Sequence, residues 1–414
     1  MKAAPIGGGD ILVEQSGPTG VGGDTNAAAF LVLDVNPTTS SVVQSFVSTQ
    51  FSSAGKMYTT TQQPLENLSL SDGGTEVSFA GWDSPGTASP LGTTQGIPLG
   101  VGTLDASGAG GMPASYNPAV LNPSPDQPHT AYSPDGVNWY FGDTDGMYYN
   151  NGTTPLAGSN GTIAIKGFGG NTYALHTIRP SIMPDQENTV GGDRISLVTP
   201  ATPGTGSITH TTILTKETPG LVIHDFYMLS SGNNSVYDTM YVTTSSGVDK
   251  YALISGTWTA EGSAALAGAS GIAAKELAGG GVSLFVSADG NSATLDELTD
   301  SAAFNATINA STPLVLYTAP TDDLLHGVSL ARTGEFGTGD AGRVRAACAG
   351  TDGRLVRGLR RCLVNEGCAQ IAAGAMLLLD SQFGPWYLAR GPGMSTENFL
   401  GACCAWPLRS RPNF

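Results

Sequence analysis

The chain has 414 residues, of which only 13% are charged and 57 are glycine. This composition disfavours long solvent-exposed helices and suits short strands joined by turns. The net charge of −16 repels nucleic-acid phosphates and anionic membrane surfaces, so we exclude nucleic acid as a partner. No run of 18 apolar residues occurs, so no membrane insertion is predicted.

Three β-type runs open the chain, at Gly9–Gln15, Ala29–Asp34 and Val42–Val47. Each alternates or clusters apolar residues between turn residues, as strands do. They are typical of the outer strands of a sheet, and no run of small residues precedes them to serve as an inner strand. The N-terminus therefore predicts an incomplete sheet.

A repeated unit follows, with starts at Asn67, His129, Thr162, His224 and Ser270. Each unit has a short strand of small residues, a glycine turn, a strand rich in aromatic and β-branched residues, a second turn and a third strand. An antiparallel meander with a period of roughly 45–60 residues is typical of propeller blades. The small first strand suits the crowded position nearest the central channel.

The run His326–Ala331 resembles the first strand of another blade, but no blade follows it. Paired with the N-terminal strands it would complete one sheet and close the ring, which removes exposed edges. We therefore predict an all-β fold in which residues 1–333 form a single β-propeller. Six blades fit best, seven also fit, and a β-sandwich followed by a second β domain is the alternative.

Five segments carry a resemblance to a known group: Gly9–Val13, Leu70–Ala88, Pro134–Tyr149, Val236–Thr259 and Leu325–Ala331. Together they resemble uncharacterised secreted β-propeller proteins of bacteria and algae. The resemblance spans nearly all of residues 9–331, and its motifs are structural. It implies the propeller fold and export, and it carries over no catalytic residue.

Residues 334–414 differ in composition from the rest of the chain. Residues 1–331 hold 8 Lys and Arg against 28 Asp and Glu, a net charge of −20, whereas the remainder has a net charge of +4 and all five cysteines. The spacing of these cysteines does not match a zinc site. We predict a separate Arg- and Cys-containing extension that is either loosely ordered or not natively translated. A basic appendage that docks on the acidic propeller or on a partner is the alternative.

Export is expected from a second feature. Six Asn-x-Ser/Thr sequons occur, a pattern of secreted glycoproteins, at Asn67, Asn151, Asn160, Asn233, Asn305 and Asn309. Residues Met1–Pro5 lack the apolar centre of a signal peptide. We expect a secreted or cell-surface protein whose leader is not part of this sequence.

Three of the five histidines fall at the predicted starts of inner strands, where propellers place their ligands. Aligned by eye, the six starts are Asn67, His129, Thr162, His224, Ser270 and His326, with Glu66, Asp225 and Ser329 beside them. His129, His224, His326 and Asp225 are the predicted ligands of a divalent metal such as zinc, and with Glu66 they are the predicted catalytic residues. The alternative is that they are polar plugs of a water-filled channel. His176 and His210 lie in outer strands and are predicted to be structural.

A second candidate is the turn Asp143–Asp145, which resembles half of a calcium loop. Position 12 of such a loop is normally a glutamate, and here it is Thr154. A hairpin turn is the alternative. The neighbouring aromatic residues Trp139, Tyr140, Tyr148 and Tyr149 could stack on a sugar but are more typical of the core between blades.

Two functions from different classes remain open. The first is a propeller that binds a small-molecule, glycan or matrix ligand at its channel mouth without chemistry. The second is an extracellular metal-dependent hydrolase, with phosphomonoester hydrolysis as its first substrate class, because a metal ion both neutralises phosphate and generates a hydroxide.

Overall fold

The computed structural model describes residues 4–17, 27–60, 67–71, 73–84, 98–116, 128–143, 145–159, 161–176, 193–202, 204–216, 222–231, 237–289 and 292–331. Within these ranges the chain forms 24 β-strands and one short 3-10 helix, Ser48–Phe51. The described residues hold no helix with the length and apolar character needed to cross a bilayer. The predicted extension 334–414 lies outside the described residues.

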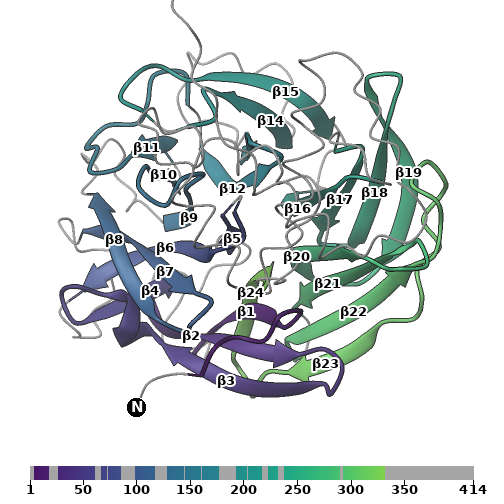
Figure 1. The fold of residues 1–414 in the computed structure, drawn as a ribbon, viewed down its shortest axis with the longest axis horizontal. Helices are drawn as coiled ribbons and strands as arrows, with labels where there is room; N and C mark the ends of the chain where they lie inside the picture. The colour runs from purple at the N-terminus through teal and green to yellow at the C-terminus, as the bar shows by residue number, and fades with distance from the viewer. Residues whose placement is uncertain are drawn as a thin grey trace, which may run out of the picture. The chain divides into compact units, whose positions relative to one another are not determined.

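Six antiparallel blades form a ring, so the predicted all-β propeller is confirmed (Figure 1). The six-blade count is also confirmed. Blade 1 contains β24 (Leu324–Leu330), β1 (Ile11–Ser16), β2 (Ala27–Asn36) and β3 (Ser41–Val47). Blade 2 contains β5 (Ser69–Leu70), β6 (Glu76–Ser84), β7 (Leu99–Asp105) and β8 (Gly110–Tyr116). Blade 3 contains β9 (Pro128–Tyr132), β10 (Tyr140–Asp143) and β11 (Met147–Tyr149).

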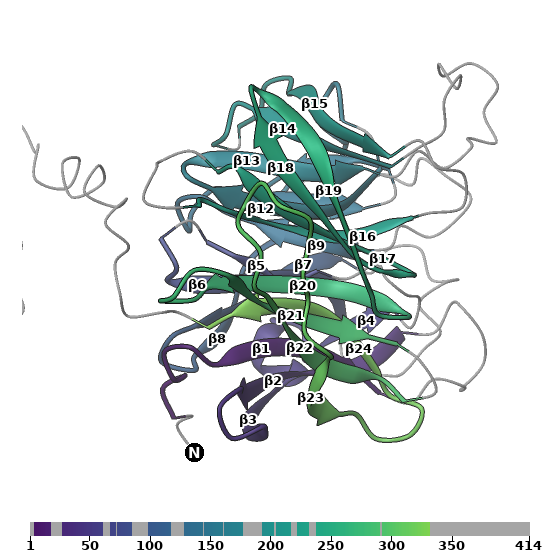
Figure 2. The same cartoon turned by 90° about the vertical axis from the view of Figure 1, so that its right-hand side faces the viewer.

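The other three blades have four strands each and follow the chain from the innermost strand outwards. Blade 4 contains β12 (Thr162–Phe168), β13 (Asn171–His176), β14 (Asp193–Thr199) and β15 (Thr209–Lys216). Blade 5 contains β16 (Ile223–Leu229), β17 (Thr239–Thr244), β18 (Gly247–Ile254) and β19 (Thr257–Ala265). Blade 6 contains β20 (Ala269–Glu276), β21 (Val282–Ala288), β22 (Thr294–Asp300) and β23 (Leu314–Thr318). Blades 5 and 6 lie side by side in Figure 2.

The ring closes in blade 1 through the two distant parts of the chain. Strand β24 pairs antiparallel with β1, placing Leu330 opposite Ile11 and Val328 opposite Val13. Strand β1 then pairs with β2, and β2 with β3. The predicted closure by N-terminal strands and the strand at 326–331 is therefore confirmed.

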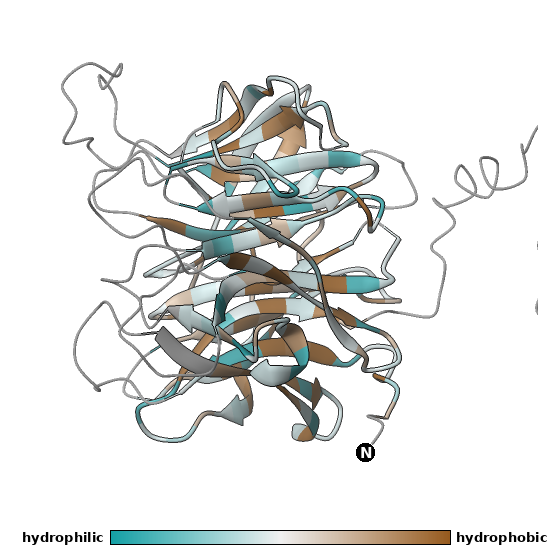
Figure 3. Ribbon diagram, turned by 90° about the vertical axis from the view of Figure 1, so that its left-hand side faces the viewer, coloured by the Kyte–Doolittle hydropathy of each residue, from teal (hydrophilic) through white to brown (hydrophobic). Residues whose placement is uncertain are grey.

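The core consists of six apolar clusters, one between each pair of neighbouring blades. The period of two along a strand explains this arrangement. In β1, Ile11 and Val13 pack toward blade 6, whereas Leu12 packs toward blade 2. Figure 3 shows hydrophobic and hydrophilic residues mixed along the strands of every part of the ring that faces the viewer. Each blade is buried on both faces, which is why its strands lack a consistently polar side.

Two details differ from a regular repeat. Blade 3 has only three strands among the described residues, and β4 (Lys56–Thr60) joins blades 1 and 2 by pairing with both β2 and β6. The aromatic residues Trp139, Tyr140 and Tyr148 are buried in the clusters on either side of blade 3. The core interpretation of these aromatics is therefore confirmed.

Candidate functional site at the channel mouth

Inner strands of five blades carry a β-bulge near their first residues. In β9 the pairing with β10 skips His129, and in β16 the pairing with β17 skips His224. In β24 it skips His326 and Gly327, in β20 it skips Ser270 and Gly271, and in β12 it skips Ile163. Bulges re-aim side chains and occur often beside functional sites. The positions predicted from the sequence, His129, His224, Ser270 and His326, are therefore equivalent in four blades. In β12 the equivalent residue is Ile163, one position after the predicted Thr162.

Three of the bulged side chains fasten their inner strand to the next blade. His129 donates from Nδ1 to the carbonyl of Thr162 at 2.8 Å, and His224 donates from Nδ1 to the carbonyl of Ala269 at 2.6 Å. Ser270 donates to the carbonyl of Leu325 at 3.4 Å. A backbone carbonyl can only accept, so both imidazoles carry a proton on Nδ1.

His224 is the most accessible of the three predicted histidines, since His129 and His326 are buried. Among the described residues the bond from Nδ1 to the Ala269 carbonyl is the one hydrogen bond of this ring, so Nε2 takes part in none of them. Burial lowers the pKa of His224, and the bond to the Ala269 carbonyl opposes this shift only in part. The ring is therefore neutral near pH 7 and offers a hydrogen-bond acceptor.

His326 has a different partner, the hydroxyl of Ser16 at the end of β1. Its Nε2 lies 2.7 Å from Ser16 Oγ, and both side chains are buried. The second ring nitrogen, Nδ1, is buried without a hydrogen-bond partner. Burial alone lowers the pKa of His326 to about 4, so this imidazole is also neutral near pH 7.

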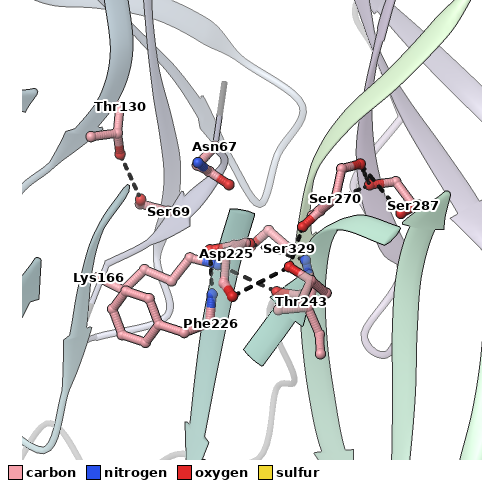
Figure 4. Close-up of polar contacts among 12 residues, drawn as sticks. Asn67, Ser69, Thr130, Lys166, Asp225, Phe226, Thr243, Ser270, Ser287 and Ser329 are labelled. Atoms are coloured by element: carbon pink, nitrogen blue, oxygen red, sulfur yellow. Dashed lines mark hydrogen bonds and ion pairs between the residues drawn. The ribbon is translucent and has the colours of Figure 1, made fainter. Parts of the chain in front are cut away.

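A buried ion pair lies below the mouth, between the inner strands of blades 4 and 5. Lys166 Nζ contacts Asp225 Oδ2 at 2.7 Å and the carbonyl of Ile272 at 3.3 Å (Figure 4). The same carboxylate accepts from the backbone N–H groups of Ile272 at 3.0 Å and Phe226 at 2.8 Å. Burial lowers the pKa of Lys166 and raises that of Asp225, and their mutual attraction opposes both shifts.

Hydrogen bonds also join blades that are not neighbours. Asn67 Nδ2 donates to the carbonyl of Ile163 at 3.1 Å, and Ser69 Oγ donates to the carbonyl of Ile165 at 2.6 Å, so blade 2 contacts blade 4. The bond from Lys166 to Ile272 similarly links blade 4 to blade 6. Figure 4 shows these side chains between the inner strands. These hydrogen bonds therefore cross the centre of the ring at this level.

The predicted catalytic and metal-binding set is not gathered into one cluster. Among the described residues no group of three or more His, Cys, Asp or Glu side chains is placed to hold a metal ion. His129, His224 and His326 bond to three separate partners, and Asp225 is engaged by Lys166 and two backbone N–H groups. Glu66 lies outside the described residues. The cation itself, zinc or calcium, stays a prediction.

The calcium-type turn joins β10 to β11. Asp143 Oδ1 accepts from the backbone N–H of Asp145 at 2.8 Å and of Gly146 at 3.1 Å. Such side-chain to backbone bonds build a hairpin turn without an ion. Ser329, also predicted beside the mouth, is buried and donates to the carbonyl of Leu330.

Lys166 and Ser16 are site residues that the sequence reasoning missed. Lys166 had a usable signal, because it is the single charged residue in the otherwise apolar and small run Thr162–Phe168. A lysine in an inner strand is buried, and a buried charge needs a partner. Ser16 had no such signal, because it lies more than 300 residues before His326.

His326 gives a pH-dependent stability. Above the unfolded-state pKa of about 6.5 the imidazole is neutral in both the folded and the unfolded protein. Between about pH 6.5 and pH 4 it is protonated in the unfolded chain but stays neutral in the folded protein, where its pKa is about 4. The free energy of unfolding should therefore decrease as the pH is lowered from 6.5 to 4, and His326 contributes at most about 1.4 kcal/mol per pH unit to this decrease. Urea unfolding across this range should show a weaker pH dependence in His326→Gln than in the wild type. Ser16→Ala keeps the imidazole and should keep the dependence, and equal slopes for wild type and His326→Gln would contradict the assignment.

No family model and no curated protein matches this chain. Similar solved structures include a mutant of the Synechocystis apocarotenoid oxygenase, with 12% identity, a TM-score of 0.35 and coverage of 80% of this chain and 94% of that one. The dihydro-heme d1 dehydrogenase NirN is 10% identical with a TM-score of 0.32, covering 80% and 78%. AztD from Citrobacter koseri is 9% identical with a TM-score of 0.29, covering 78% and 99%. At these TM-scores the likenesses carry no argument about function.

Proposed function

We propose that this protein is a secreted or cell-surface propeller that binds a ligand at its channel mouth and performs no chemistry on it. The observation that carries the proposal is His224, a neutral, partly exposed imidazole with an unused Nε2 lone pair. It stands at a bulge, next in the chain to Asp225 of the buried Lys166–Asp225 pair. A ligand entering the mouth would meet a preformed polar surface, which lowers the cost of binding.

The rest of the scaffold supports recognition at this end of the ring. Two further strands end beside the inner strands: Ser16 at the end of β1 contacts His326, and His176 at the end of β13 contacts Thr162. The hydrogen bonds that fix His129 and His224 to the next blade hold their rings in one orientation.

The ligand we propose is an uncharged, hydroxyl-rich molecule such as a glycan. The net charge of −20 on residues 1–331 opposes the approach of anions. An imidazole Nε2 lone pair accepts a hydrogen bond from an O–H group, and such directed bonds determine the orientation of small ligands.

Export is part of the same proposal. Of the sequons, Asn151, Asn305 and Asn309 are exposed and could accept a glycan. Asn67 could not, because its side chain is buried and its amide donates to the carbonyl of Ile163.

His224→Asn is the sharpest test of the site. The asparagine amide can still donate to the Ala269 carbonyl, as the amide of Asn67 does to the carbonyl of Ile163, but it removes Nε2. We expect unchanged thermal unfolding and, for any glycan that the wild type binds on a panel, at least about tenfold weaker binding, since one directed hydrogen bond is worth about 0.5–1.5 kcal/mol and an unpaired ligand hydroxyl costs more. Isothermal titration calorimetry would measure the dissociation constant of the glycan for both proteins.

Thr259→Ala, an exposed change on the outermost strand of blade 5, is the matched control and should bind as the wild type does. Equal affinity of His224→Asn and wild type would remove His224 from the site. Turnover of phosphate esters that requires added zinc and is lost in His129→Ala/His326→Ala would overturn the proposal in favour of the hydrolase.

A further inference from the structure

A second polar cluster lies on blade 4, and it adjoins the channel mouth through Thr162, whose carbonyl accepts from His129 and whose hydroxyl lies 3.3 Å from His176 Nδ1. Arg194 and Ser196 are two residues apart on β14 and therefore stand on the same face of the sheet. His176 on β13 is directly opposite Arg194, and His210 on β15 is opposite Val198, which shares that face. Val198 packs against residues of blade 3, so this face lies between blades 3 and 4.

The two imidazole rings meet across β14. His176 Nε2 lies 2.9 Å from His210 Nδ1, and the ring centroids are 4.3 Å apart at an interplanar angle of 86°. Strands β13 and β15 flank β14 on opposite sides. The contact therefore carries the ring of His210 over the face of β14 on which Arg194 and Ser196 stand.

Three buried polar atoms of this cluster have no hydrogen-bond partner within the part of the chain that the structure describes: Arg194 Nε, Ser196 Oγ and His210 Nε2. The Ser196 side chain is completely buried. A buried donor left unsatisfied costs about 1–3 kcal/mol, and such atoms in a native protein indicate a missing ligand or ordered water. Three on one face of one sheet point to a shared ligand.

The charge of this cluster is as informative as its geometry. Two other interior cations are paired with carboxylates, Lys166 with Asp225 and Lys250 with Asp300. Among the described residues Arg194 forms no ion pair, although residues 1–331 carry 28 acidic side chains. An arginine without a carboxylate partner in this part of the chain is suited to an anion from outside.

All three atoms can donate. When His176 Nε2–H donates to His210 Nδ1, the proton of His210 is on Nε2, and His176 Nδ1 then accepts from Thr162 Oγ1, which lies 3.3 Å away. Burial, and secondly the charge of Arg194, lowers the pKa of His210 to about 4, so the ring is a neutral donor at pH 7. Arg194 Nε and the Ser196 hydroxyl supply the other two donors.

We propose that Arg194, Ser196 and His210 form a binding site for a small oxyanion, a carboxylate or a phosphate group, between blades 3 and 4. Arg194 supplies the charge, Ser196 and His210 supply directed hydrogen bonds, and His176 positions the ring of His210. The site uses side chains other than His224, on which the proposed function rests, and it is linked to the mouth only through the contacts of His176 with Thr162 and of Thr162 with His129.

The test uses the full chain and three sodium salts at equal ionic strength: acetate, phosphate and chloride. We expect acetate or phosphate, whichever group the site accepts, to raise the midpoint of thermal unfolding with saturation, and chloride to do so much less. Arg194→Gln should weaken this effect at least tenfold in apparent Kd, because it removes the charge and Nε. Arg194→Lys keeps the positive charge and should retain part of the stabilisation by the oxyanion.

Lys275→Gln, which removes an equal charge from the exposed end of β20, is the matched control and should respond as the wild type does. Ser196→Ala removes an unsatisfied hydroxyl, so it should fold at least as stably without the anion but bind it more weakly. Saturable stabilisation by acetate or by phosphate tells the two sources apart. Equal responses of wild type and Arg194→Gln, or no oxyanion effect beyond that of chloride, would overturn the proposal.

Discussion

Lys166→Met is expected to lower the free energy of unfolding by about 3–5 kcal/mol, the usual cost of removing one partner of a buried ion pair. Asp225 would then remain buried without this cation, since the 2.7 Å contact to Lys166 is its one ion pair among the described residues. The loss should increase with pH, because burial already raises the pKa of Asp225 and its charged form becomes less tolerable without the lysine. Urea unfolding at pH 5 and pH 8 measures both effects.

Two variants separate the ion pair from the loss of a long side chain. Lys166→Met/Asp225→Asn removes both charges and keeps one side-chain oxygen, which can accept from the backbone N–H of Ile272 or from that of Phe226 but not from both, so it should recover part of the stability. Lys275→Met, on an exposed part of β20, should change stability by less than about 0.5 kcal/mol. A loss of similar size in Lys166→Met and Lys275→Met would show that the pair contributes nothing.

Gly327→Ala is expected to disturb the closure of the ring. A Cβ at this position would lie 2.2 Å from the backbone nitrogen of Leu68 and 2.8 Å from the carbonyl carbon of Asn67. These are backbone atoms of blade 2, so no side chain can rotate away, and β24 would have to shift from β5. Overpacking a core commonly costs about 1–3 kcal/mol, and we expect the upper end of that range or more, measured as a lower midpoint of urea unfolding.

Gly271→Ala should act in the same way, because its Cβ would lie 2.5 Å from the carbonyl oxygen of His326. The matched control is Gly279→Ala, in the turn between β20 and β21, where a Cβ meets no atom within 4 Å. That variant should be as stable as the wild type or slightly more stable. If Gly327→Ala and Gly279→Ala unfold at the same denaturant concentration, the inner strands are not as tightly packed as the structure shows.

The fold could be predicted in outline because its determinants are local and repeated. Short apolar runs bounded by turn residues identify strands wherever they fold. An incomplete sheet at the start and a lone strand at 326–331 together implied closure, because unpaired edges are unfavourable. The pairing of Val13 with Val328 is the detail that confirms this reasoning.

The candidate site could be predicted only as a set of positions. The sequence placed His129, His224, Ser270 and His326 at equivalent points of their blades, and the bulges bear this out. It could not show which atom each ring would bond, since the partners Thr162, Ala269 and Ser16 come from other strands. A bulge interrupts the two-residue alternation of a strand, so the direction of a bulged side chain cannot be predicted from the alternation of residues in the sequence.

The sequence by itself determined the strands, their grouping into blades and the acidity of the propeller, because each depends on residues close together in the chain. Only the tertiary structure decided that Asp225 meets Lys166, that Asn67 reaches Ile163 across the ring, and that Arg194 Nε is buried with no hydrogen-bond partner among the described residues. The physical reason is that a buried charge or donor acquires its partner from whatever the closed ring brings within about 3 Å, and ring closure brings together residues as far apart in the chain as Ser16 and His326.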